Sequence, residues 1–246
     1  MIRNDHAEAK EQLAKLEQEQ KPLALLKWKE NDDNTVTISG IKDKSVETLY
    51  IPNYIKGKQV ISLWSHDFQN GVFKGCINLK EIHLPDSLKS IGGYVFEGCS
   101  SLVEIHLPDS LKSIGRYAFK GCSSLVETHL SVSLKSIGRY AFKDCTSLVK
   151  THLPVSLKSI DEGTFANCTN LKEIHLSNSL QSIGDGAFAS CTSLNEIYLP
   201  DSLQYIGTCV FYNCKNLKRI YISSENYEKF VDRFPKTAQF KKPCFS

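Results

Sequence analysis

Cysteine is the most regularly spaced reactive residue in the sequence. A ladder of thiols could form disulfides, bind zinc or sense redox state. However, side chains from successive repeats run parallel, whereas a disulfide needs converging Cβ atoms and zinc needs a tetrahedral set of ligands. The ladder cysteines are therefore expected to be buried, unbridged core residues, and Cys209 and Cys244, off the ladder, to be the reactive thiols. The ladder, with a period of 23 residues, consists of Cys76, Cys99, Cys122, Cys145, Cys168, Cys191 and Cys214.

Histidine forms a second ladder with the same period. It consists of His83, His106, His129, His152 and His175, and it continues as Tyr198 and Tyr221. Each of these residues stands between two apolar positions, so the two-residue period of a strand points it away from the core. Carboxylates run beside it at Glu81, Glu104, Glu127, Glu173 and Glu196, with Lys150 and Arg219 in the same row. We predict that this strip binds a protein partner, because aromatic rings provide contact area and carboxylates select the partner's charge.

Other interpretations of the histidine ladder stay open. Five imidazoles at strand spacing could respond to protonation or take up a transition metal as a linear array. No repeat supplies the three or four fixed ligands of a metal cage, so no metal or cofactor site is predicted. A ladder also repeats the same groups instead of gathering nucleophile, base and orienting group in one place, so no catalytic residue is predicted.

Two smaller ladders lie elsewhere in the repeats. The tyrosines could stack on a base or sugar, but packing between neighbouring repeats is expected. The serines are expected to bond backbone groups at turns. The first ladder consists of Tyr94, Tyr117 and Tyr140, with Arg116 and Arg139, and the second of Ser87, Ser110, Ser133, Ser156, Ser179 and Ser202.

All these ladders reflect one repeated unit. Residues 79–101 differ from residues 102–124 at only four of 23 positions, which is typical of a solenoid whose repeats stack on their neighbours. Ile82 and Leu84 alternate with polar residues and predict a short strand, which Pro85 ends. A second extended stretch is predicted over 87–91, followed by a helical or 3₁₀ turn over 94–98 that directs Phe96 and Cys99 inward.

The unit resembles the BspA-like (Treponema-type) leucine-rich repeat. The residues that carry the resemblance are Leu102, Ile105, Leu107, Pro108, Ser110, Leu111, Ile114, Gly115, Ala118, Phe119 and Cys122, and they recur through most of the chain. Residues 35–38 and 49–60 look like the family's opening hairpin and longer first repeat. The resemblance implies a solenoid rich in short parallel strands. It also implies a binding or adhesion protein, often at the cell surface of bacteria or some protists.

The two ends are expected to cap the array. The predicted organisation is a polar N-terminal helix or cap over 1–24, a capping hairpin over 25–45, repeats over 46–223 and a C-terminal cap over 224–246. Glu8–Gln20 reads as a polar helix that Pro22 ends. Ser224 is expected to N-cap a helix from Glu225 to Arg233. The core-covering side chains of that helix region are expected to be Tyr227, Phe230, Val231 and Phe234.

Composition limits the partner and the location. A net charge of +3 spread over 246 residues favours neither nucleic acid nor membrane insertion, and the sequence leaves the oligomeric state open. A protein partner is predicted, and a glycan is possible. The lack of a signal-peptide or membrane-spanning run, together with free thiols, predicts a cytoplasmic protein or one exported without a cleaved signal. The family resemblance keeps a surface or secreted adhesin as the alternative.

Overall fold

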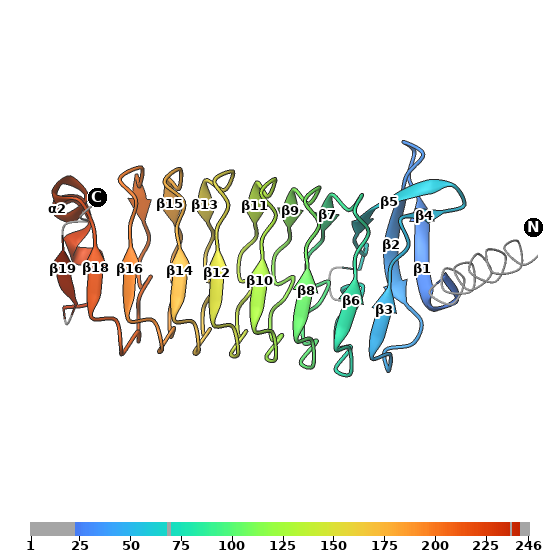
Figure 1. The fold of residues 1–246 in the computed structure, drawn as a ribbon, viewed down its shortest axis with the longest axis horizontal. Coiled ribbons are helices and arrows are strands. Elements are labelled where there is room, and N and C mark those ends of the chain that lie inside the picture. The colour runs from blue at the N-terminus through green and yellow to red at the C-terminus, as the bar shows by residue number, and fades with distance from the viewer. Residues whose placement is uncertain (1–22, 68–69, 237, 242–246) are drawn as a thin grey trace, which may run out of the picture.

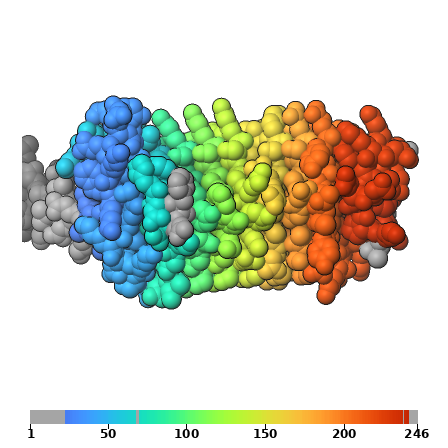
Figure 2. All heavy atoms as spheres, turned by 180° about the vertical axis from the view of Figure 1, so that it is seen from behind, coloured from blue at the N-terminus to red at the C-terminus, as the bar shows by residue number. Residues whose placement is uncertain are grey.

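The chain folds as a solenoid with two rows of short strands. The computed structural model describes residues 23–67, 70–236 and 238–241. The strands stack along the long axis, with a hairpin at one end and helix α2 (Ser224–Phe230) at the other (Figure 1). From behind, the side chains form one continuous elongated surface (Figure 2). The expected β-rich repeat solenoid is therefore confirmed.

Each repeat gives a three-residue strand to the front row and a two-residue strand to the back row. The front strands are β6 (Glu81–His83), β8 (Glu104–His106), β10 (Glu127–His129), β12 (Lys150–His152), β14 (Glu173–His175), β16 (Glu196–Tyr198) and β18 (Arg219–Tyr221). The back strands are β7 (Ser90–Ile91), β9 (Ser113–Ile114), β11 (Ser136–Ile137), β13 (Ser159–Ile160), β15 (Ser182–Ile183) and β17 (Tyr205–Ile206). Paired strands are parallel and in register, so equivalent residues of successive repeats lie side by side.

The core between the two rows consists of ladders. Most leucine and isoleucine positions of the repeats are buried, as are all seven ladder cysteines, whereas Leu84, Leu130 and Leu176 are partly buried. The phenylalanine rings stack on one another with centroids 5.1–5.9 Å apart. This column consists of Phe73, Phe96, Phe119, Phe142, Phe165, Phe188 and Phe211.

The segment that follows each back strand is a series of turns, and the helical or 3₁₀ turn expected over 94–98 occurs as single turns closed by i→i+3 hydrogen bonds, not as a continuous helix. The N–H groups of Tyr94, Phe96 and Gly98 donate to carbonyls of the next repeat, whereas those of Glu97 and Cys99 donate to carbonyls three residues earlier. Because bonds to the next repeat alternate with local ones, no continuous helix forms. Tyr94 and Gly98 also adopt positive φ angles, of 62° and 73°.

The back row is interrupted between β11 and β13, which do not pair within the described residues. At the position after each back strand, glycine lets the repeats approach closely: a Cβ on Gly138 would lie 2.6 Å from the nitrogen of Arg116, and one on Gly184 2.7 Å from that of Glu162. The N–H groups of both glycines bond the preceding repeat at 2.8 Å. Asp161 occupies the equivalent position in the repeat that follows β11, where the back row is interrupted.

The N-terminal end begins with an antiparallel hairpin of β1 (Leu26–Glu30) and β2 (Val36–Ile41). Strand β2 pairs in parallel with β5 (Lys58–Leu63), which continues the back row into β7. Strand β3 (Thr48–Tyr50) pairs with β6 at the front, and β4 (Tyr54–Ile55) pairs with β5. The hairpin therefore covers the end of the core. The predicted helix Glu8–Gln20 lies outside the described residues.

The C-terminal cap differs in detail from the expectation. Ser223, not Ser224, is the N-cap, because its hydroxyl accepts from the N–H of Asn226. Helix α2 ends at Phe230 and a 3₁₀ turn, η1, spans Val231–Arg233, which leaves Val231 exposed. Phe230 and Phe234 are buried as expected and Tyr227 is partly buried. An unpredicted strand, β19 (Gln239–Lys241), pairs with β18 and closes the front row.

Candidate binding face

The front strands expose one strip of side chains, which we call the front strip. In β8 the burial alternates, so Ile105 is buried while Glu104 and His106 face solvent. Among the four ladder histidines that pair with a glutamate, His106 has the most exposed side chain, at 81 %. The same alternation places all five ladder histidines and Tyr198 on the exposed side, and Tyr221 is partly exposed. The front strip is formed by His83, His106, His129, His152, His175, Tyr198 and Tyr221.

The rings of the front strip associate in pairs. His83 stacks on Tyr50 of strand β3 at 4.1 Å, a residue that sequence reasoning did not include. The remaining stacked pairs are His106–His129 at 6.4 Å, His152–His175 at 4.5 Å and Tyr198–Tyr221 at 4.1 Å. Among the described residues, no ring contact joins one pair to the next. The strip is thus divided into four aromatic plates.

Carboxylates hold the imidazoles on their own strands. The Nε2 atom of His83 lies 2.9 Å from Oε1 of Glu81, and that of His106 lies 3.4 Å from Oε1 of Glu104. Glu127 pairs with His129 at 3.6 Å, and Glu173 pairs with His175. Farther along, Glu196 is 2.7 Å from the guanidinium of Arg219.

Two pKa values on the strip, those of Glu173 and His152, are lowered from their ordinary values. The hydrogen bond from His175 lowers the pKa of Glu173. Partial burial, followed by the charges of His175 and Lys150, lowers the pKa of His152. Both shifts favour a neutral His152 beside an ionised Glu173.

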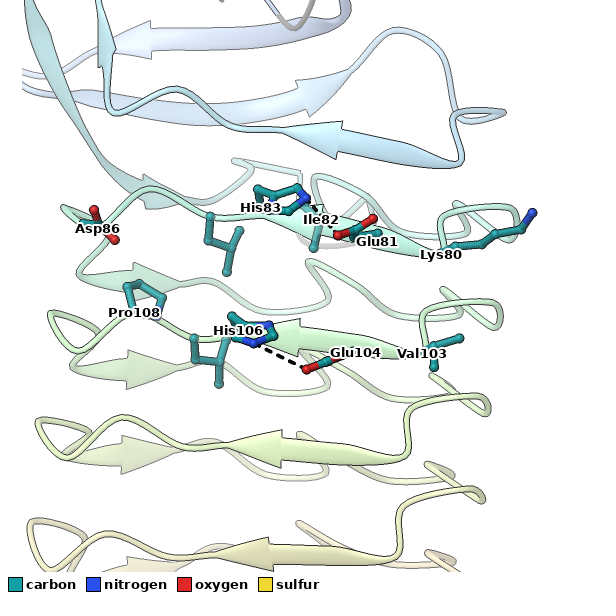
Figure 3. A pocket seen from close by; sticks show the side chains of 11 residues that line it. Lys80, Glu81, Ile82, His83, Asp86, Val103, Glu104, His106 and Pro108 are labelled. Atoms are coloured by element: carbon teal, nitrogen blue, oxygen red, sulfur yellow. Dashed lines mark ion pairs between the residues drawn. The ribbon is translucent and has the colours of Figure 1, made fainter. Parts of the chain in front are cut away.

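A pocket of about 410 Å³ lies between β6 and β8, and we call it the β6–β8 pocket. These two strands are neighbours but do not pair within the described chain. Figure 3 shows His83 and Glu81 directed toward each other on one strand and His106 and Glu104 likewise on the next. Lys80 lies at one end of the pocket, and Asp86 and Pro108 lie at the other.

The central repeats carry apolar residues on the surface and polar residues in the core, at positions that sequence reasoning missed. Val132 and Val155 stand where Asp86 and Asp109 stand in earlier repeats, and both valines are at least 70 % exposed. The same two repeats bury Thr128 and Thr151, whose hydroxyls are 3.0 Å apart. The substitutions are visible in the aligned repeats, but only the structure shows that they coincide.

The ladder cysteines are all free and buried, and the exposed Cys209 lies off the ladder. Burial raises the pKa of the Cys76 and Cys214 thiols to about 11 and that of Cys99 to about 12. Burial also raises the pKa of Cys122, Cys145, Cys168 and Cys191 well above the ordinary value. Neutral thiols are poor nucleophiles and poor metal ligands. Cys244 lies outside the described residues.

The tyrosine ladder packs on itself, as expected. Tyr94, Tyr117 and Tyr140 stack with centroids 5.1 Å apart, and Arg116 lies over two of the rings. The column ends at Gly163, which has no ring. The ring of Tyr140 covers this position, since a Cβ there would lie 2.2 Å from it. A hydrogen bond to Glu162 raises the pKa of Tyr140 to about 12. This column is therefore closed to a ligand inserted between its rings.

The serine ladder binds the backbone. Four hydroxyls donate to carbonyls of an earlier repeat at 2.6–2.8 Å, and Ser179 donates to the carbonyl of Val155. The four are Ser87, Ser110, Ser156 and Ser202. Ser133 instead donates its backbone N–H to the hydroxyl of Ser131.

No group of three or more His, Cys, Asp or Glu side chains in residues 23–67, 70–236 and 238–241 is arranged to hold a metal ion. In the same part of the chain, no helix has the length and apolar character needed to cross a bilayer.

Comparison with known proteins agrees with the repeat architecture. The family model for the BspA type leucine rich repeat region matches residues 66–168 and 135–241, in six copies. A leucine rich cell surface protein from Faecalibacterium prausnitzii A2-165 superposes with a TM-score of 0.70 and 29% identity, over 79% of this chain and 52% of that chain. This chain therefore spans about half of that protein's length.

The T. pallidum Leucine Rich Repeat protein superposes with a TM-score of 0.59 and 26% identity, over 88% of this chain and 98% of that chain. No curated protein gives a significant match. The family model covers more than half of the chain, in the repeats that form the strand rows. The chain therefore belongs to the BspA type leucine rich repeat proteins.

Proposed function

We propose that the chain is a non-catalytic scaffold that binds a protein partner on its front strip. The observation that carries the proposal is the continuous exposure of imidazole and phenol rings, in stacked plates, along the front strands. Rings already ordered by stacking lose little conformational freedom when a partner covers them. The carboxylates beside them, Glu81, Glu104, Glu127, Glu173 and Glu196, favour a partner with complementary positive charge.

The central repeats supply the apolar part of this surface. Val126 and Val132 lie in the repeat of His129, and Val155 lies in that of His152, and all three valines are exposed. Toward the ends of the array, aspartates such as Asp86 and Asp201 stand in the place of Val132 and Val155, and Lys80 and Lys172 stand in the place of Val126. An apolar centre with a polar rim is typical of a protein-binding surface, in which central residues contribute most of the binding energy.

The experiment compares two triple variants with the wild type. His106→Ala, His129→Ala and His152→Ala together should weaken binding of the native partner, purified from the host, by about tenfold or more, since central contacts dominate affinity. The matched control is Lys112→Ala, Lys135→Ala and Lys158→Ala, which changes exposed residues of the same three repeats beside the back row. It should bind like the wild type. Unchanged affinity of a folded histidine variant would place the binding site on another face.

A cell-surface adhesin for a protein or glycan is the second candidate. The likeness to a leucine rich cell surface protein of Faecalibacterium favours it. Labelling of intact host cells with a membrane-impermeant amine reagent tests this location. Labelling of this chain at the level of a known surface protein would support the adhesin, and labelling at the level of a cytoplasmic protein would reject it.

A further inference from the structure

We infer that the β6–β8 pocket receives an arginine side chain of the protein partner. This inference rests on the proposed function and gives one contact of the front strip a defined chemistry. Its basis is the juxtaposition of two imidazole rings and two carboxylates around a cavity at a place where the front row is unpaired. A guanidinium is planar, cationic and able to bond a carboxylate with two N–H groups at once.

The ring positions leave a space between two plates. The ring of His83 stacks on that of Tyr50 with an angle of 2° between the two planes, and the ring of His106 stacks on that of His129. No described ring fills the interval between His83 and His106. A planar guanidinium can occupy such an interval, because it stacks on aromatic faces. An ammonium group has no plane with which to do so.

The charges at the pocket select a cation. Glu81 and Glu104 contribute one carboxylate from each strand, and Asp86 adds a third at the end of the pocket (Figure 3). Lys80 is the basic group among the lining residues, but its Nζ lies 2.8 Å from Glu47, outside the pocket. The lining thus keeps an excess of negative charge when the histidines are neutral, and it is complementary to arginine.

In the described part of the chain the front row is also unpaired between β14 and β16, but there Tyr198 takes the place of the second histidine. On β12 and β14, His152 and His175 are stacked at 4.5 Å, which leaves no interval for a planar group. The carboxylate there, Glu173, is bonded to His175 and lies 3.8 Å from Lys150. Glu173 is therefore a matched control, since it is a strip carboxylate outside the β6–β8 pocket, beside two histidines that already stack on each other.

Nuclear magnetic resonance of the imidazoles tests the inference with N-acetyl-arginine methylamide as the probe and the lysine analogue as its comparison. The arginine probe should shift the His83 and His106 resonances saturably, and the lysine probe should bind at least about threefold more weakly because it cannot stack. Glu81→Gln together with Glu104→Gln should weaken arginine binding about tenfold, since hydrogen bonds between charged groups are lost. Glu173→Gln should leave it unchanged. Circular dichroism checks that each variant is folded.

Three results would overturn the inference: no saturable shift, equal affinity for both probes, or an equal effect of Glu173→Gln. These results are separable from failure of the proposed function. If the triple histidine variant loses the partner but the probe does not bind, the strip is the docking face and the arginine contact is wrong. If the probe binds but the triple variant keeps the partner, the docking face is wrong and the pocket is a site unconnected with it, which also rejects the inference.

Discussion

The thiol of Cys99 donates a hydrogen bond to the backbone carbonyl oxygen of Phe73, with sulfur and oxygen 3.1 Å apart. The same carbonyl accepts from the N–H of Cys76 at 3.0 Å, so both of its lone pairs are used although it lies in the core. The contact recurs at 3.1–3.2 Å in each following repeat. The cysteine ladder therefore joins neighbouring repeats by hydrogen bonds as well as by packing.

Burial of the ladder predicts the redox behaviour of its cysteines. The seven ladder thiols should be unbridged and should react slowly with iodoacetamide in the native protein, because burial raises their pKa and only the thiolate attacks. The exposed Cys209 should react fast. Fast reaction of Cys244 stays a prediction from sequence. Mass spectrometry without reductant decides both points, and a disulfide between two ladder cysteines would refute the first.

Asp161 and Gly184 allow a reciprocal test of the interruption in the back row. Asp161→Gly should stabilise the protein by about 1 kcal/mol, because β11 and β13 can then form the missing bonds. Gly184→Asp should destabilise it by about 1–3 kcal/mol, because a Cβ there meets the backbone of Glu162. Urea denaturation measures both. A loss of stability in Asp161→Gly would show that the aspartate does not cause the interruption.

The carboxyl of Asp161 should also make stability depend on pH. Burial raises its pKa, so the folded protein holds this proton more tightly than the unfolded chain does. Its favourable contribution is present below the unfolded pKa, about 3.9, and is lost as pH rises through the folded pKa. Asp161→Asn should therefore be more stable than the wild type at pH 7, and the difference should shrink toward pH 3.5. A difference that does not change with pH would contradict this assignment.

The buried threonine pair should show coupled energetics. Thr128→Val or Thr151→Val alone should cost about 1–3 kcal/mol, because each leaves the other hydroxyl buried without its partner. The double variant should cost less than the sum of the two, because no polar group is then left unpaired. Urea denaturation of the four proteins gives the coupling energy. Additive losses would mean that the two hydroxyls do not support each other.

The repeat period made the ladders predictable, but not the differences between repeats. A residue such as Phe142 or His106 follows from the period alone, because in-register stacking places equivalent residues together. The pairing of the rings does not follow from the period. His83 stacks on Tyr50, which lies in a longer first repeat whose register the period does not define. The β6–β8 pocket follows from that pairing and was likewise missed.

Single departures from the consensus were visible, but their structural effects were not. Asp161 in place of glycine could have signalled the interruption, because only glycine permits the close approach of backbones seen at Gly138. Strand β19 lacked any repeat signal, so its pairing with β18 could not be derived. The N-cap of helix α2 was misplaced by one residue because Ser223 and Ser224 are equally suitable by type.

Histidine footprinting tests the docking face most directly. Diethyl pyrocarbonate modifies accessible imidazoles, and His66 provides an internal control because it is exposed and lies off the strip, beside Trp64. With the native partner bound, modification of His106, His129 and His152 should fall several-fold as their exposed rings are covered, and modification of His66 should not change. Equal modification of the strip histidines with and without partner would contradict the account.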